Sequence, residues 1–390
     1  MGVEHHGLLQ PAFPKEEFTS RQAGVCQGLS AAGLDAGLFF SAESVFYLCG
    51  YEYPTHAGFQ LLVIPVEGAP FLVIRHHILS GANATTWIED KIAFPDTGDP
   101  IETTRQALVD RKLGSARLGI EEASLTLPVR TARAITAALP DATFKDCSAI
   151  VETLRLVKSP REIAYMRLAA AVSDAGIEAA REMIKVGVSE RKIAIAATRR
   201  MMEVGGEYQA IPLLVGIEEN SKLAAPIWTS RKLGAGEFLW IEVFGTVRRY
   251  ATGLKATFAA GPASAAALKR VEIASAALER GIAAIAPGEP ASVVPDAVQA
   301  VFVEAGNKET SHHQSGYSIG VSFSPATHEA RLLSLRRGNS TLLKEGMTLF
   351  PIANLYSDGA TVSASATVVV TKTGAERLTK FQPQPDDLAR

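Results

Sequence analysis

The segment LVKSPREIAYMRLAAAVSDAGIEAA, residues 156–180, contains a helix start marked by three signals at once. Ser159 can cap the helix backbone, Pro160 suits the first helical position, and Glu162 completes a capping box. The sequence therefore predicts a helix that begins at residue 160.

Small and apolar side chains then recur at helical spacing until about Lys185, and Gly187 ends the pattern. One stripe of this helix contains Ile163, Met166, Ala170 and Ser173. A chain of 390 residues exceeds the size at which a single core usually stops growing, so the helix start also indicates a domain boundary. We predict one domain over residues 1–157 and a second over residues 158–390.

The first domain alternates short apolar runs with amphipathic segments. The apolar runs are bounded by turn residues and are typical of strands: GLFF at 37–40, FQLLVIPV at 59–66 and FLVI at 71–74. Three segments have helical spacing with polar outer faces: 15–33, 101–112 and 127–138. This alternation predicts an α/β domain.

The second domain is predicted to begin with two helices and then to mix long helices with strands. Ala-rich helices are expected at 263–286 and 292–305. The expected strands are 238–244, 254–259, 317–323, 347–355 and 366–371. Helices grouped apart from antiparallel strands are typical of α+β packing, with helices on one face of a curved sheet.

The composition excludes several classes of partner. Lys plus Arg total 39 and Asp plus Glu total 41, and this balance gives no positive field for nucleic acid or an anionic membrane. No stretch approaches the roughly 18 apolar residues of a membrane span, and the N-terminal residues do not resemble a signal peptide. Three cysteines (Cys26, Cys49 and Cys147) are too few for a disulfide framework or a zinc site. We expect a cytoplasmic protein whose partners are a small-molecule substrate and a second copy of the chain.

Four further strings accompany the helix start at 156–180. They are GLDAGLFFSAESVFYLCGYEY (33–53), EFLWIEVFGTVRRYATGLKATF (237–258), HQSGYSIGVSF (313–323) and LSLRRGNSTLLKEGMTLF (333–350). In this order and spacing they resemble the pita-bread superfamily of creatinase and aminopeptidase P. The resemblance covers nearly the whole chain. It implies an α/β N-terminal domain and an α+β pita-bread domain with a curved antiparallel sheet, in a protein that forms homodimers.

Metal-dependent members of this superfamily bind two cations through two Asp, one His and two Glu, and the metal pair activates a water molecule. The matching positions here hold Glu242, Gly253, Tyr317, Ile352 and Ser365. One carboxylate cannot hold a dinuclear centre of hard cations. The resemblance therefore implies a chain with no metal site and no cofactor.

Local details are similar to the metal-independent members, creatinase and the ectoine hydrolase group. The string GYSIG carries Tyr317 where metal enzymes carry His, and Glu329 precedes the run Ser334-Leu335-Arg336 with Gly338 after it. This similarity implies a hydrolase that cleaves a C–N bond in a small, polar, nitrogen-containing metabolite.

A metal-free hydrolase needs positioned acids, bases and cations in place of the metal. Glu242 and Glu329 are the candidate carboxylate pair, and Lys255 is a candidate cation or base. Each residue also has a simpler interpretation: Glu242 on a solvated strand face, Glu329 as a loop acid, and Lys255 as an exposed strand lysine.

The superfamily pattern supplies the remaining candidates. His313 and Tyr317 are candidates to orient a substrate or stabilise an oxyanion, although Tyr317 can also serve a core hydrogen bond. Candidates for substrate binding are Tyr250, Arg249 and Trp228 from the same chain, and Tyr53, His56 and Arg75, which would reach the pocket of a second copy.

Two positions weaken the catalytic interpretation. Ala225 and Ala251 lie where related sequences carry His residues close to the substrate. Two alternatives therefore stay open: a non-catalytic domain that binds a ligand or peptide, and a lyase in which Glu242 or Lys255 abstracts a proton.

Overall fold

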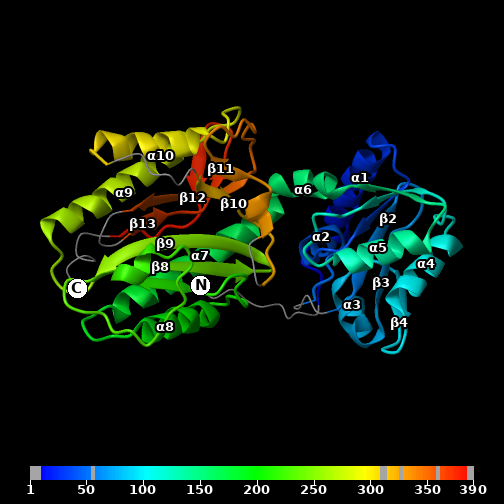
Figure 1. Ribbon diagram of the computed structural model, residues 1–390, viewed down its shortest axis with the longest axis horizontal. Coiled ribbons are helices and arrows are strands. Elements are labelled where there is room, and N and C mark those ends of the chain that lie inside the picture. The colour runs from blue at the N-terminus through cyan, green and yellow to red at the C-terminus, as the bar shows by residue number, and fades with distance from the viewer. Residues whose placement is uncertain (1–9, 54–57, 308–313, 325–327, 357–360, 384–390) are drawn as a thin grey trace. The chain divides into compact units, whose positions relative to one another are not determined.

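The computed structural model describes residues 10–53, 58–307, 314–324, 328–356 and 361–383. The chain divides into two compact units, residues 5–155 and residues 156–390, which are described one at a time. The first unit is α/β and the second groups its helices against antiparallel strands (Figure 1), so the predicted fold class is confirmed.

A six-stranded mixed sheet forms the centre of the first unit, in the order β4-β3-β2-β1-β5-β6. Its strands are β1 (Ala36–Phe39), β2 (Gln60–Pro65), β3 (Phe71–Arg75), β4 (Asp90–Phe94), β5 (Arg117–Ile120) and β6 (Thr143–Asp146). Strands β1, β2 and β3 are buried on both faces of the sheet. Their side chains therefore enter two separate apolar cores, one on each face. The three predicted strands correspond to β1, β2 and β3, whereas β4, β5 and β6 were not predicted.

The helices of this unit are α1 (Lys15–Ala31), α2 (Ala42–Cys49), α3 (Leu79–Thr85), α4 (Pro100–Asp110), α5 (Val129–Ala138) and α6 (Ser148–Leu156). All eight residues of α2 are buried, so its sequence lacks the polar face that marks an amphipathic helix. The carboxylate of Glu121, at the end of β5, accepts hydrogen bonds from the backbone N–H groups of Phe40 (2.7 Å) and Ser41 (2.8 Å). This long-range contact holds the start of α2.

The second unit begins with α7 (Pro160–Met183), which packs against α8 (Glu190–Glu203). The predicted capping box is confirmed. Ser159 Oγ accepts a hydrogen bond from Glu162 N at 3.3 Å, and Glu162 Oε2 accepts one from Ser159 N at 2.9 Å.

Two antiparallel sheets meet in this unit. One contains β7 (Leu214–Ile217), β8 (Phe238–Val247) and β9 (Tyr250–Ala259). The other contains β10 (Gln314–Ser318), β11 (Ser334–Arg336), β12 (Thr348–Leu355), β13 (Val362–Ser365), β14 (Val368–Val370) and β15 (Ala375–Arg377). Side chains join the sheets where β9 lies beside β13: Lys255 N donates to Ser365 Oγ at 2.7 Å, and Gly253 N donates to Thr367 Oγ1 at 3.0 Å.

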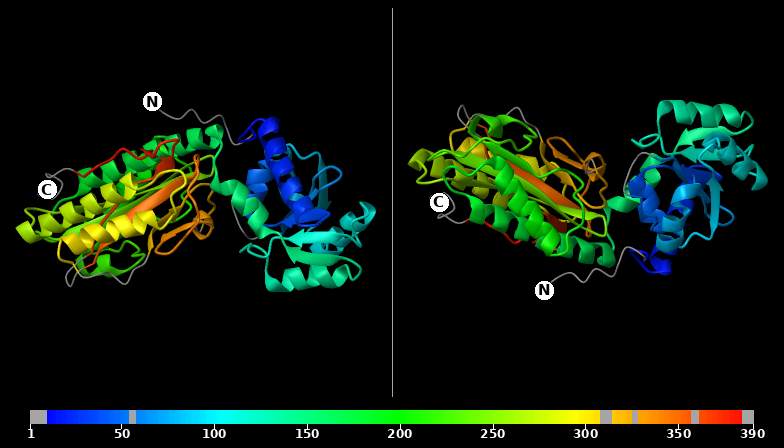
Figure 2. Two further views of the ribbon diagram at one scale, coloured as in Figure 1. Left: turned by 90° about the horizontal axis from the view of Figure 1, so that it is seen from above. Right: turned by 90° about the horizontal axis from the view of Figure 1, so that it is seen from below.

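Helices cover one face of these sheets. Helix α7 packs on β8 and β9 and α8 packs on α7 and β7, whereas α9 (Ala265–Ala283) and α10 (Val293–Glu304) pack on β12 and its neighbours. The two later helices lie side by side, as the view from above in Figure 2 also shows.

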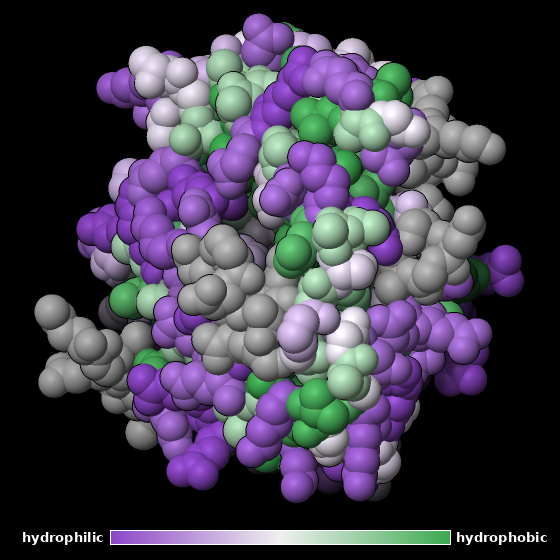
Figure 3. Space-filling model, turned by 90° about the vertical axis from the view of Figure 1, so that its left-hand side faces the viewer, coloured by the Kyte–Doolittle hydropathy of each residue, from purple (hydrophilic) through white to green (hydrophobic). Residues whose placement is uncertain are grey.

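The surface shown in Figure 3 is mainly hydrophilic, with small hydrophobic areas between the polar residues. Such scattered apolar exposure is ordinary for a folded domain. Within the described part of the chain, none of the helices combines the length and apolar character that crossing a membrane requires.

Candidate active site

The β8–β9 hairpin places the candidate carboxylate and lysine directly opposite each other. In the antiparallel register Glu242 pairs with Lys255. Their neighbours Val243, Leu254 and Ala256 enter the core beneath α7 and α8. Because successive strand residues point to opposite faces, Glu242 and Lys255 project from the face turned away from these helices.

Glu242 and Lys255 form a buried pair. Lys255 Nζ lies 3.9 Å from Glu242 Oε2, and each side chain is only 7% exposed. Burial raises the pKa of the Glu242 carboxyl and lowers the pKa of the Lys255 amine, and the opposite charge of the partner partly offsets each shift. The solvated-face interpretation of these two residues is therefore wrong.

Trp240 completes this arrangement, although sequence reasoning did not select it. Lys255 Nζ lies 3.5 Å from the centroid of the indole ring, which is a cation–π geometry. The indole N–H donates to the carbonyl of Ser221 at 2.8 Å, and Ser221 Oγ accepts from Thr361 N at 2.8 Å. Trp240 lies two residues before Glu242 on the same strand face, and this spacing is the signal that identifies it.

Aromatic rings lie around Gly253, two residues before Lys255 on β9. A Cβ on Gly253 would lie 2.6 Å from Phe350 Cζ, so the Phe350 ring takes the space of any side chain there. Phe350 packs edge-on against Phe244 (centroids 5.9 Å apart) and against Tyr317 (5.5 Å). We call Phe244, Phe350 and Tyr317 the aromatic cluster.

The donor set does not fit a metal centre. Ile352 lies opposite Ser365 in the β12–β13 register, and the Ser365 hydroxyl binds the backbone of Lys255. Among residues 10–53, 58–307, 314–324, 328–356 and 361–383, no three His, Cys, Asp or Glu side chains are grouped to hold an ion. Hard divalent cations need several oxygen ligands. Of the five positions that correspond to the family's metal ligands, one holds a carboxylate, Glu242.

We expect the Gly253→Ala variant to lose about 1–3 kcal/mol of unfolding free energy, because its methyl group collides with the buried Phe350 ring. Urea denaturation of Gly253→Ala, Phe350→Ala and the double variant measures the coupling between the two positions. The cost of Gly253→Ala should largely disappear when Phe350 is already Ala. An equal cost in both backgrounds would show that the ring does not fill this space.

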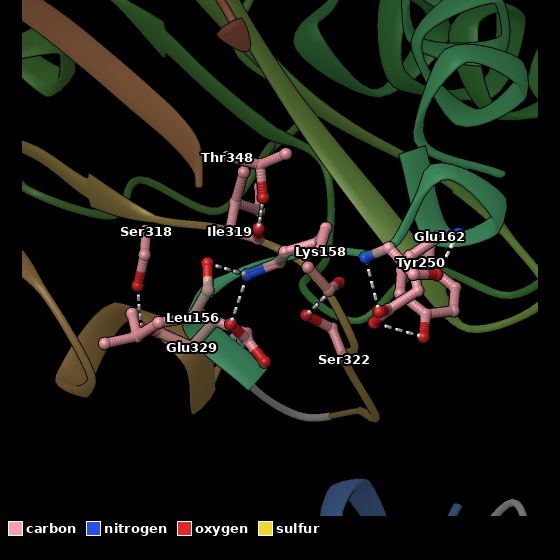
Figure 4. A network of polar contacts seen from close by, with 11 residues as sticks. Leu156, Lys158, Glu162, Tyr250, Ser318, Ile319, Ser322, Glu329 and Thr348 are labelled. Carbon is pink, nitrogen blue, oxygen red and sulfur yellow. Dashed lines mark hydrogen bonds and ion pairs between the residues drawn. The ribbon is translucent and has the colours of Figure 1, made fainter. Parts of the chain in front are cut away.

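Glu329 does not join Glu242. Its Oε2 lies 3.0 Å from Lys158 Nζ, with side-chain exposures of 0% for Glu329 and 1% for Lys158. Figure 4 shows Lys158 reaching from the start of the second unit toward the segment that carries Glu329. The expected Glu242–Glu329 pair is therefore wrong, since a buried cation already engages the Glu329 carboxylate.

The position of Gly320 shows how far Glu329 lies from the β8–β9 pair. A Cβ on Gly320 would lie 2.7 Å from Lys158 Cε and 3.3 Å from Glu329 Cδ, so the ion pair packs directly on this glycine. The Gly320 carbonyl accepts a hydrogen bond from Ala251 N at 2.9 Å. Ala251 is four residues from Lys255 along β9, a distance of about 13 Å. The Lys158–Glu329 ion pair therefore lies near the Ala251 end of β9, away from Glu242 and Lys255.

Tyr250 and Arg249 have internal partners. Tyr250 donates its hydroxyl to Glu162 Oε1 at 2.8 Å, and thus supports the start of α7 (Figure 4). Arg249 Nη2 lies 2.8 Å from Glu207 Oε2, and its guanidinium lies 3.5 Å from the Tyr208 ring centroid. Both side chains are buried, so we assign them structural roles in place of the expected substrate binding.

The Glu207 carboxylate also supports the turn between β8 and β9. Arg248 and Arg249 have φ angles of 49° and 65°, in the left-handed region that favours glycine. Glu207 accepts hydrogen bonds from both of their backbone N–H groups, at 2.8 and 3.2 Å. This contact offsets the strain of the turn that sets the Glu242–Lys255 register.

The other predicted residues are scattered. Trp228 is half-buried on the second unit's core, and Tyr53 is half-buried on the first unit's core. Arg75 pairs with Asp96 at 2.7 Å on the surface. His313 and His56 lie outside the described residues.

The fold and the site define a two-domain pita-bread protein. Residues 21–157 match the creatinase/prolidase N-terminal domain, and residues 164–372 match metallopeptidase family M24. The chain belongs to family M24, and its named relatives include hydrolases.

Curated relatives match over nearly the whole chain. An ectoine hydrolase from Halomonas elongata is 24% identical, over 95% of this chain and 97% of its own length. A creatinase from a Bacillus species is 26% identical, over 97% of this chain and 94% of its own length. An Xaa-Pro dipeptidase structure from Bacillus anthracis has a TM-score of 0.84 at 23% identity and covers 95% of this chain and 99% of its own, which shows the shared fold.

Proposed function

We propose that this protein is a metal-independent hydrolase of a C–N bond in a small, polar, nitrogen-containing metabolite. One observation carries the proposal. Glu242 and Lys255 form a buried pair, while the other metal-ligand positions of the family hold Gly253, Tyr317, Ile352 and Ser365. The residues that remain suit acid–base chemistry better than cation binding.

Each member of the pair has a role in hydrolysis. The Glu242 carboxylate accepts a proton from a water molecule whose oxygen attacks the carbon of the C–N bond. An electron pair of the C=O or C=N bond moves onto the heteroatom, and the Lys255 ammonium stabilises that charge. When the C–N bond breaks, the proton held by Glu242 moves to the leaving nitrogen. Together, the two products contain the atoms of the substrate and of one water molecule.

The named relatives support this substrate class. Two of them are an ectoine hydrolase and a creatinase, and both names refer to small nitrogen-containing zwitterions. Other relatives and structural neighbours are Xaa-Pro dipeptidases, so dipeptides that contain proline belong in the same screen.

A thermal-shift screen followed by isotope labelling tests the proposal. Ectoine, creatine, guanidino acids and proline dipeptides are screened first, because a compound that binds the native state raises the melting temperature. Each stabilising compound is then incubated with the protein in ¹⁸O-labelled water. We expect one labelled oxygen in the carbonyl product. An unlabelled product of elimination would identify a lyase instead.

We expect a bell-shaped pH profile of kcat/KM that is narrower than a free glutamate and lysine would give. The rate rises as Glu242 loses its proton, and burial raises the pKa of this carboxyl above its ordinary value. The rate falls as Lys255 loses its proton, and burial lowers the pKa of this amine. Lys255→Arg should move the descending limb to higher pH, and an unmoved limb would remove Lys255 from the reaction.

A non-catalytic binding role is the second candidate. Ala225 and Ala251 carry no proton-transfer group where related sequences carry His, and this favours binding without turnover. A compound that stabilises the protein yet yields no product, in the unmodified protein and in Glu242→Gln alike, would support this role.

We also propose that the protein acts as a homodimer in which Tyr53 and His56 of one copy complete the site of the other. Support comes from the chemistry of the site, because Glu329 binds Lys158, and Lys255 is the charged group that the described part of the chain places beside Glu242. Sedimentation velocity should give a dimer, and a monomer at catalytic concentrations would contradict it.

A further inference from the structure

A cavity of about 300 Å³ lies in the second unit beside β9, and Lys255 is among the residues that line it. Its floor includes Leu254 and Ala256 of β9 and Ala364 of β13, whose side chains point toward the helix-covered face. Its volume is at the lower end of the range for small-molecule sites.

The chain after β15 forms one wall of this cavity. Asp174 of α7 accepts hydrogen bonds from the backbone N–H groups of Lys380 (2.8 Å) and Phe381 (3.0 Å). Phe381 packs on Phe258, with ring centroids 6.0 Å apart, and lines the cavity. Leu278 of α9 adds a second apolar wall. These contacts hold the apolar part of the enclosure in place.

Arg377 brings a positive charge to this enclosure, whose lining also includes Lys255. Its Nη1 lies 2.9 Å from Glu279 Oε1, and the side-chain exposures are 17% for Arg377 and 56% for Glu279. Across the described residues, Arg377 Nε and Nη1 are buried and lack a hydrogen bond of good geometry. Buried guanidinium N–H groups normally find acceptors, and an ion pair with an exposed carboxylate contributes little.

We propose that this cavity binds a small monocarboxylate with an apolar body. The ligand's carboxylate binds the Arg377 guanidinium, which can take a carboxylate through two N–H groups. Its apolar part packs against Leu278 and Phe381. Glu279 repels additional negative charge, and therefore favours a monoanion over a phosphate or a dicarboxylate. The cavity borders Lys255 of the proposed hydrolytic site, but the proposal rests on Arg377 and does not depend on the proposed activity.

Isothermal titration with benzoate tests the site, with uncharged benzamide as the matched probe. Arg377→Gln removes the charge, and Ser275→Trp fills the cavity from α9. Arg280→Gln is the control, because Arg280 lies on the same helix and pairs with Glu304 at 2.7 Å on the surface. Melting curves establish that each variant is folded.

We expect saturable benzoate binding that is at least tenfold weaker in Arg377→Gln, absent in Ser275→Trp and unchanged in Arg280→Gln. Benzamide should bind at least tenfold more weakly than benzoate. Absence of benzoate binding to the unmodified protein would overturn the proposal. Binding of equal strength in Arg377→Gln would also overturn it, even if Ser275→Trp fails to fold.

Discussion

The Glu242→Gln variant should lose about 10²- to 10⁴-fold in kcat, the usual contribution of a positioned general base. The amide has the shape of the carboxylate but cannot accept the proton of the attacking water. Because the Glu242 side chain is only 7% exposed, bulk water is poorly placed to take over this role. Steady-state kinetics on the compound identified by the thermal-shift screen measure the loss.

Two further variants show whether the loss is specific to Glu242. Glu237→Gln changes a half-buried carboxylate just before β8, and it should leave kcat within about twofold because Glu237 binds Arg231 (2.8 Å) and the Gly234 N–H and takes no part in the Glu242–Lys255 pair. Lys255→Met should also lower kcat if the ammonium stabilises charge. Full activity in Glu242→Gln, with an unchanged melting temperature, would remove Glu242 from the reaction.

The Glu329→Ala variant should lose about 3–5 kcal/mol of unfolding free energy, because it leaves the Lys158 ammonium buried without its partner. The two side chains are 0% and 1% exposed, so water cannot replace the missing carboxylate without rearrangement. Urea denaturation followed by circular dichroism measures the change.

Apolar replacement of both partners separates charge from packing. Lys158→Met/Glu329→Leu should be far more stable than Glu329→Ala, since an apolar pair carries no unpaired charge. Glu203→Ala is the surface control, because Glu203 pairs with Arg199 on the exposed face of α8, and it should change stability by less than about 0.5 kcal/mol. If Glu329→Ala kept normal stability but lost activity, Glu329 would return as a catalytic residue.

Local signals made much of the fold predictable. The capping box at Ser159 and Glu162 lies within one helical turn, and it forms as predicted. Long amphipathic helices and apolar strands were found near their observed positions. Helix α2 was missed because all its residues are buried, and β6 was missed because its residues are mostly exposed and polar.

The site was less predictable because its contacts are long-range. Counting outward from the Arg248-Arg249 turn would have placed Lys255 opposite Glu242, since Glu242 lies six residues before Arg248 and Lys255 lies six residues after Arg249. No local pattern links Glu329 to Lys158, which is 171 residues away in the chain. The occupation of Gly253's side-chain space by Phe350 likewise depends on how β9 meets β12.

The most direct test of metal-independent hydrolysis is the turnover of the identified substrate before and after exhaustive chelation, with and without added Mn²⁺, Co²⁺ or Zn²⁺. We predict rates that agree within about twofold under all conditions, because Glu242 and Lys255 supply the acid–base chemistry themselves. Loss of turnover on chelation, with recovery on adding one of these ions, would contradict this account.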